Sequence, residues 1–113
     1  MLSIVNDYDN KCLELFKVGL PNAQLIMRDE NIVGVIDYEN HDTSIKIFYI
    51  TILDEYKRQH IAQNIITQIK EENQGKYMYG DALPGALKFW ESLGAEFDED
   101  PDEDYLTPFH INC

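Results

Sequence analysis

Cysteine, long apolar runs and metal-binding spacings are scarce in this chain, and each shortage excludes a class of protein. Two cysteines in 113 residues, one of them the last, are too few for a disulfide framework, so a reduced, cytoplasmic protein is expected. No apolar stretch approaches the roughly 20 residues that a membrane-spanning helix needs. The opening residues, MLSIVNDYDNK, lack the basic-then-apolar order of a signal peptide. Neither a membrane span nor a leader is therefore predicted.

The chain also has little positive charge. Nine lysines and arginines stand against 21 aspartates and glutamates, which gives a formal net charge of −12. Binding through nucleic-acid phosphates needs a basic face, so nucleic acid is not an expected partner. The acidity suits a basic partner instead, such as an amine, a polyamine or a lysine-rich surface. Residues 96–104, EFDEDPDED, carry seven of the carboxylates and no base.

The remaining candidates for a metal site do not have the required spacing. His41, His110 and Cys113 do not form a metal-ligand pattern. The aspartates of the acidic run alternate as in a calcium loop, but Glu103 stands at the required glycine position and Phe109 at the closing glutamate. No metal site is predicted.

The apolar residues that are present predict one α/β domain over residues 1–113. The chain is 44% hydrophobic, which is enough for a single core of this length. Tyr8, Cys12, Leu15 and Phe16 have helical spacing, with Asn6 or Asp7 as N-cap, and Leu20, Pro21 and Asn22 would end that helix. AQLIMRD and IVGVIDY are predicted as two strands joined by a hairpin turn at DEN, and Gly34 predicts a bulge or a close backbone approach.

The second half of the chain predicts a central strand followed by alternating helices and strands. SIKIFYITIL, residues 44–53, is apolar on both alternating faces, which is typical of a central strand covered on both sides. A helical apolar stripe follows, which consists of Ile61, Ala62, Ile65, Ile66 and Ile69. After it come a short strand at KYMYG, a helix in PGALKFWESLG that stops at Gly94, and closing strands at AEF and YLTPFHI. This order predicts a mixed sheet with helices on its faces.

The stretch EYKRQHIAQN, residues 55–64, concentrates bases where the central strand leads into the long helix. The first N–H groups of a helix have no partner within it, and together with the helix dipole they favour an anion such as phosphate. Lys57 and Arg58 would add positive charge there. The alternative is an ordinary surface turn, in which Asp54 and Glu55 partly cancel these charges.

Two segments of the chain resemble the signatures of the GNAT superfamily of N-acyltransferases. The run Lys57-Arg58-Gln59-His60-Ile61-Ala62 is similar to the family's acetyl-CoA signature, Gln/Arg-x-x-Gly-x-Gly/Ala. ALKFWESLGAEF resembles the second signature, Ala-x-x-Phe-Tyr-x-x-x-Gly-Phe, on a helix. The two lie in the family's order and at about its spacing, so the resemblance covers residues 44–97.

The resemblance implies a GNAT-like mixed, mostly antiparallel sheet and an acetyl-CoA-dependent N-acetyltransferase. The backbone from Arg58 to Ala62 would hold the pyrophosphate, and the backbone of Ile50 and Ile52 would pair with the pantetheine arm. A backbone N–H near Ile52 would polarise the thioester carbonyl, in the gap where strands 45–53 and 76–80 splay apart. The cofactor-binding residues so implied are Ile50, Ile52, Lys57, Arg58, Gln59, His60, Ile61, Ala62, Phe89 and Trp90. For Phe89 and Trp90, whose spacing with Leu93 is helical, the alternative is packing in the core. A primary amine of a basic acceptor would attack the thioester directly.

The chain departs from the family pattern at four positions, the first of which is Asp54, where proline is common after the central strand. His60 replaces a glycine that lets backbone approach phosphate, and its side chain either turns outward or donates to phosphate itself. Trp90 replaces a tyrosine that protonates the departing thiolate, and an indole N–H is no usable acid. Either Tyr79 or solvent protonates the thiolate instead, or turnover is weak. Leu83 stands where the family often has asparagine.

The general base is not assigned by the sequence. Asp81, after the short strand, and Asp37 or Glu39, at the end of the hairpin, are candidates to place a base or a water molecule. The alternative for each is a solvated loop carboxylate. Tyr49 and Tyr79 are strand tyrosines for which half-buried packing is the competing role.

The acceptor and the assembly are open as well. One N-terminal helix instead of the family's two suggests an open acceptor cleft, suited to a protein side chain or a polyamine, in a monomer or a homodimer. The acidic run would attract a cationic acceptor, or it is a plain hairpin loop. The alternative function is a catalytically weak or inactive protein of the same fold that binds a basic partner.

Overall fold

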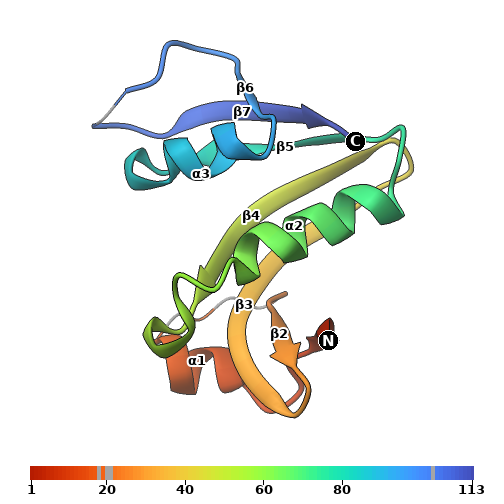
Figure 1. The fold of residues 1–113 in the computed structure, drawn as a ribbon, viewed down its shortest axis with the longest axis vertical. Helices are drawn as coiled ribbons and strands as arrows, with labels where there is room; N and C mark the ends of the chain where they lie inside the picture. Colours follow the sequence, from red (N-terminus) through yellow and green to blue (C-terminus); the bar gives the residue numbers. More distant parts are fainter. Residues whose placement is uncertain (18, 20–21, 103) are drawn as a thin grey trace. The chain divides into compact units, whose positions relative to one another are not determined.

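The chain forms a mixed α/β structure, shown in Figure 1 as a computed structural model that describes residues 1–17, 19, 22–102 and 104–113. The described residues hold seven strands in one sheet, in the order β1-β2-β3-β4-β5-β7-β6. Its strands are β1 (Leu2–Asn6), β2 (Gln24–Arg28), β3 (Asn31–Asn40), β4 (Ser44–Ile52), β5 (Tyr77–Ala82), β6 (Glu96–Phe97) and β7 (Thr107–Asn112). The helices are α1 (Lys11–Phe16), α2 (Ile61–Glu72) and α3 (Leu87–Ser92), with 3-10 turns at Asp54–Tyr56 and Pro84–Ala86.

The pairing confirms the predicted mixed, mostly antiparallel sheet. β4 and β5 are parallel, and the pairs β1–β2, β2–β3, β5–β7 and β6–β7 are antiparallel. By contacts, the chain divides into two compact units: Met1–Tyr38 with Tyr49–Ile65, and Glu39–Phe48 with Ile66–Cys113. One domain over residues 1–113 stays a prediction.

The first unit opens with a strand, β1, that the sequence pattern does not predict. β1 lies at one edge of the sheet and pairs with β2 from Leu2↔Arg28 to Asn6↔Gln24. Leu2 and Ile4 are half-buried, whereas Ser3 and Val5 are exposed. A five-residue edge strand buries little apolar surface, so its sequence signal is weak and its ladder with β2 determines its conformation.

Helix α1 begins later and ends earlier than predicted. Residues 8 and 9 form a turn, and Asn10 has a positive φ of 55°, which is not right-handed helical geometry. Tyr8, predicted on the apolar face, is 88% exposed, so this assignment is wrong. Lys17, with a φ of 61°, ends the helix after Phe16. The predicted stop at Leu20 and Pro21 falls outside the described residues.

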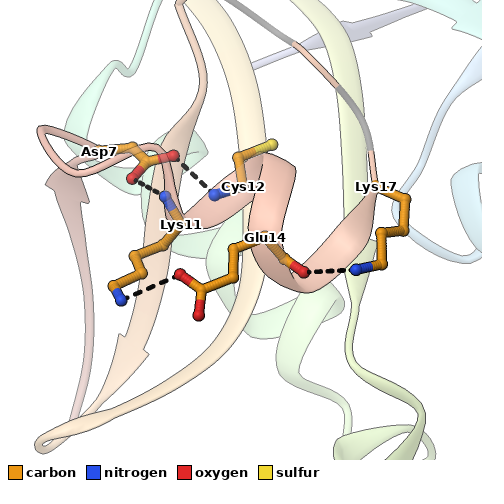
Figure 2. Close-up of polar contacts among 5 residues, drawn as sticks. All are labelled: Asp7, Lys11, Cys12, Glu14 and Lys17. Carbon is orange, nitrogen blue, oxygen red and sulfur yellow. Dashed lines mark hydrogen bonds and ion pairs between the residues drawn. The ribbon is translucent and has the colours of Figure 1, made fainter.

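The N-cap residue is Asn10, so the prediction of Asn6 or Asp7 at this position is wrong, but the Asp7 carboxylate still accepts hydrogen bonds from the start of α1 (Figure 2). Its Oδ1 accepts a hydrogen bond from the Lys11 N–H at 2.7 Å, and its Oδ2 accepts one from the Cys12 N–H at 2.8 Å. Both donors belong to the first turn, where helix geometry leaves N–H groups without partners. The cap holds α1 in place while Cys12 packs on Ala23 and Val35, with Phe16 and Tyr49 against this cluster.

We expect Asp7→Ala to lower the free energy of unfolding by about 1–2 kcal/mol, because two helical N–H groups lose their acceptor. Asp9→Ala removes the same charge two residues away, from an exposed side chain in the turn, and serves as the matched control. Urea denaturation followed by circular dichroism would measure both variants. Equal losses of stability would show that the cap contributes nothing beyond its charge.

Gly34 of β3 lies close to the backbone of β4, which confirms the prediction for this glycine. The register between β2 and β3 shifts there: Ile26 pairs with Gly34 and Met27 with Ile32, so Val33 is skipped. The Val33 carbonyl instead accepts a hydrogen bond from the Leu53 N–H at 2.9 Å. A Cβ atom on Gly34 would lie 2.6 Å from the Thr51 carbonyl oxygen and 2.7 Å from Ile52 Cδ1.

The second unit has its core between α3 and the strands β5 and β7. Trp90 of α3 stacks on Phe109 of β7 with ring centroids 4.2 Å apart, and Gly80 of β5 leaves room for the Phe109 ring. Gly94 follows α3 with a φ of 87°, as its predicted role as a helix stop requires. Phe48 of β4 is 47% exposed, so the prediction of a strand covered on both sides is wrong at this residue.

Helix α2 has the apolar stripe that the sequence predicts. All four isoleucines of the stripe are buried; Ile61 and Ile65 belong to the first unit, and Ile66 and Ile69 belong to the second. Ala62 is only half-buried, because it lies in the first turn beside the exposed loop. α2 begins at Ile61, at the end of the loop that follows β4, and its buried stripe holds this first turn against the rest of the structure.

Candidate functional site

The loop between β4 and α2 has backbone geometry that normally calls for glycine. Arg58 and His60 have positive φ values of 68° and 58°. Histidine tolerates this left-handed region better than most residues, so His60 supplies the conformation that glycine would supply at this position of the signature. The His60 carbonyl accepts the Asn64 N–H at 2.9 Å, which forms the first turn of α2, and its Nδ1 lies 3.2 Å from Gln63 Oε1. The absence of glycine therefore does not alter the type of loop.

Three bases surround this loop, and one of them is not evident in the sequence pattern. Arg28 of β2 donates from Nη1 to Gln59 Oε1, and its guanidinium lies over the Tyr56 ring at 5.2 Å from the centroid. Lys57 Nζ pairs with Asp54 Oδ1 at 2.9 Å, so Asp54 partly cancels its charge, as in an ordinary surface turn. Arg58 is exposed and has no ion pair with a described residue. Arg28 is not evident from the sequence pattern because it lies 31 residues from Gln59, and the fold of the sheet brings the two side chains together.

Ile50 and Ile52 lie on β4 past the last rung that β4 shares with β5. That parallel ladder covers Ser44–Ile47 and Tyr77–Gly80, whereas β5 stays paired with β7 as far as Ala82↔Thr107. Ile50 and Ile52 are both half-buried. The ladder therefore ends where the predicted separation of the two central strands begins.

Phe89 and Trp90 make packing contacts in the second unit. Trp90 is 4% exposed, lies on Phe109, and meets the Phe89 ring edge-on at 4.9 Å between centroids. Tyr79 is half-buried and Asp81 is exposed. Tyr79 and Asp81 belong to the second unit, whereas the loop from Lys57 to Ala62 belongs to the first.

The other carboxylates named as candidates differ from one another. Asp37 is 8% exposed inside β3, so the solvated-loop alternative is wrong for it, because β3 continues to Asn40. Glu39 is exposed and pairs with His41 at 2.9 Å. Two acids of the acidic run hold His110: Asp98 Oδ1 lies 2.6 Å from its Nδ1, and Glu96 Oε2 lies 3.3 Å from its Nε2. These two side chains anchor β6 to β7.

The described residues contain no group of three or more histidine, cysteine, aspartate or glutamate side chains arranged to hold a metal ion. Among the helices of the same residues, none is long and apolar enough to cross a membrane.

Solved structures similar to this chain are acetyltransferases, although the sequence itself matches no protein-family model and no curated protein. Naa50 of Arabidopsis thaliana, in complex with the bisubstrate analogue CoA-Ac-MVNAL, is 15% identical, with 99% of each chain covered and a TM-score of 0.69. The diaminobutyrate acetyltransferase EctA of Paenibacillus lautus, with its substrate and coenzyme A, is 13% identical over 99% of this chain and 95% of that one, with a TM-score of 0.69.

A GNAT-family protein of Desulfovibrio desulfuricans is 7% identical over 99% of both chains, again with a TM-score of 0.69. At these identities the likeness concerns the fold. The sheet order, the loop after β4 and these similarities together show that the chain has the fold of the GNAT acetyltransferases.

Proposed function

We propose that this protein is an N-acetyltransferase that uses acetyl-CoA and acts as one domain over residues 1–113. The observation that carries the proposal is the loop after β4, in which Arg58 and His60 adopt positive φ values immediately before α2. A loop of this kind turns successive N–H groups toward one side, which suits a phosphate. The complexes of similar structures with coenzyme A or its analogues support the same cofactor.

In this proposal the cofactor is held mainly by backbone. The N–H groups from Arg58 through Gln59, His60 and Ile61 to Ala62 bind the pyrophosphate, with the Lys57 and Arg58 side chains nearby. Arg28 adds a charge from β2 and holds Gln59 in place. The half-buried Ile50 and Ile52 offer their backbone to the pantetheine arm, as an added strand does. Bound acetyl-CoA would supply an activated acetyl group.

The reaction we infer is direct attack by a primary amine of a basic acceptor. Burial raises the pKa of the Cys113 thiol, an effect that Lys70 opposes, and the thiol therefore stays protonated at neutral pH. Cys12 is buried. Neither cysteine is thus suited to carry the acetyl group, which agrees with a reaction without an acyl-enzyme. A backbone N–H near Ile52 polarises the carbonyl, and Tyr79 and Asp81 are the side chains that we assign to proton transfer.

Thermal unfolding with and without acetyl-CoA tests the proposal. At a ligand concentration a hundredfold above Kd, binding to the folded state adds about 2.7 kcal/mol, which raises the Tm of a domain of this size by on the order of 10 °C. A fragment that contains pantetheine but no pyrophosphate is the matched control and should give a much smaller rise. No shift with either compound, at millimolar concentrations, would contradict the cofactor site.

A further inference from the structure

The second unit carries a row of aromatic side chains on the sheet face opposite α3. We call Phe48, Tyr77, Tyr79 and His110 the aromatic face. Lys46, Tyr79 and His110 are direct partners across β4, β5 and β7, so their side chains point to the same side. Tyr77 lies 5.8 Å from Tyr79 and stacks on His110 at 5.3 Å between ring centroids. Phe48 and Tyr77 are 47% and 40% exposed, so both rings are accessible from solvent.

An ammonium group already lies against this face. Lys46 Nζ is 4.7 Å from the centroid of Phe48 and 6.0 Å from that of Tyr79. Lys46 forms no ion pair with a carboxylate of the described residues, in contrast to Lys11 and Lys57. The negative faces of the two rings are therefore its partners, and they show that the aromatic face has the geometry to accept an alkylammonium.

The second unit is acidic, and one of its carboxylates lies on the strand that carries two of the rings. Asp81 follows Tyr79 by two residues on β5, so its side chain starts from the same side of the strand. It is exposed and has no hydrogen bond or ion pair with a residue of the described ranges. The residues of the second unit include 13 acids and four bases, a formal charge of −9 that leaves −3 of the total −12 for the first unit. A cation is thus drawn to this unit and finds a free carboxylate beside the rings.

We propose that the aromatic face and Asp81 bind an alkylammonium group of the acceptor, which takes the place of the Lys46 ammonium over Phe48 and Tyr79. The identification of this ligand as the acceptor rests on the proposed function; the binding site itself does not. The amine that attacks a thioester must be neutral, whereas the group that binds to rings and a carboxylate must be charged. The ammonium bound here is therefore the acceptor before it loses its proton, in the proton transfer that we assign to Tyr79 and Asp81.

Calorimetric titration with 1,5-diaminopentane at low ionic strength, with and without coenzyme A, tests the site. Pentane-1,5-diol has the same length without charge and should not bind. Lys46→Met should lower the Kd of the diamine about two- to fivefold, because the tethered ammonium no longer competes for the rings. Lys88→Met is the matched control: it removes the same charge from an exposed lysine of α3 that has no partner among the described residues, and it should change the Kd less. Asp81→Asn should raise the Kd.

The outcomes separate this inference from the proposed function. Absence of saturable diamine binding to a protein that responds to acetyl-CoA would overturn the inference alone. Equal effects of Lys46→Met and Lys88→Met would also overturn it, because binding would then depend only on overall charge. Specific diamine binding without any response to acetyl-CoA would support the site and overturn its role in acetylation. A peptide with two adjacent lysines, titrated in the same way, distinguishes a protein acceptor from a free diamine, since the tighter ligand identifies the source.

Discussion

Replacement of Ala62 with glutamate is expected to reduce the affinity for acetyl-CoA by about a hundredfold or more and to leave the fold intact. Ala62 is the second residue of α2 and is half-buried beside the loop proposed to hold the pyrophosphate. A carboxylate about 5 Å from one phosphate charge, at an effective dielectric constant of about 20, costs roughly 3 kcal/mol. The same carboxylate at a helix N-terminus interacts favourably with the helix dipole, so α2 itself should not be destabilised.

The matched control for Ala62→Glu is Gln74→Glu. Gln74 is exposed and lies 12 residues after Ala62, past the end of α2, so the added charge is on the order of 18 Å away along the helix axis. The thermal shift caused by acetyl-CoA, measured over a concentration series, gives the affinity of each variant. A folded Ala62→Glu protein that binds acetyl-CoA as the wild type does would show that the pyrophosphate site is not at the start of α2.

The second large effect is expected at Gly34, where alanine should lower the free energy of unfolding by about 2–3 kcal/mol. The added Cβ would lie 2.6 Å from the Thr51 carbonyl oxygen, which is backbone and cannot rotate away, and 2.7 Å from Ile52 Cδ1. Either β3 or β4 must shift, at a cost typical of overpacking in a well-packed core. A loss of this size lowers the Tm by on the order of 10 °C.

Gly85→Ala is the control for the same chemical change. A Cβ on Gly85 would meet nothing within 4 Å, and this residue has no positive φ. We expect it to be neutral or slightly stabilising, because alanine restricts the unfolded chain more than glycine does. Chemical denaturation of both variants measures the difference. Similar stabilities of the two would mean that β3 and β4 do not approach as closely at Gly34 as the structure has them.

The features that the sequence determined are those set by neighbouring residues. The apolar stripe of α2, the hairpin from β2 to β3 and the glycine stop after α3 each depend on a local pattern of period or of turn residues, and each is present in the structure. The loop after β4 was also recognisable as a resemblance to a signature, because its bases and its small residue lie within six consecutive residues, 57–62. His60 is compatible with this loop even though it replaces a glycine, because histidine accepts the positive φ that the loop requires.

The features that only the tertiary structure decided depend on contacts between residues far apart in the chain. Strand β1 exists because β2 pairs with it, and α1 is short because its cap comes from Asp7 across a turn. Arg28 reaches the loop after β4 through the sheet, and Trp90 becomes a core residue because Phe109 of β7 lies against it. The aromatic face likewise results from the register of three strands, which places Lys46, Tyr79 and His110 in one row. Local sequence carries no information about register, because pairing between strands is set by the whole hydrophobic pattern of the sheet.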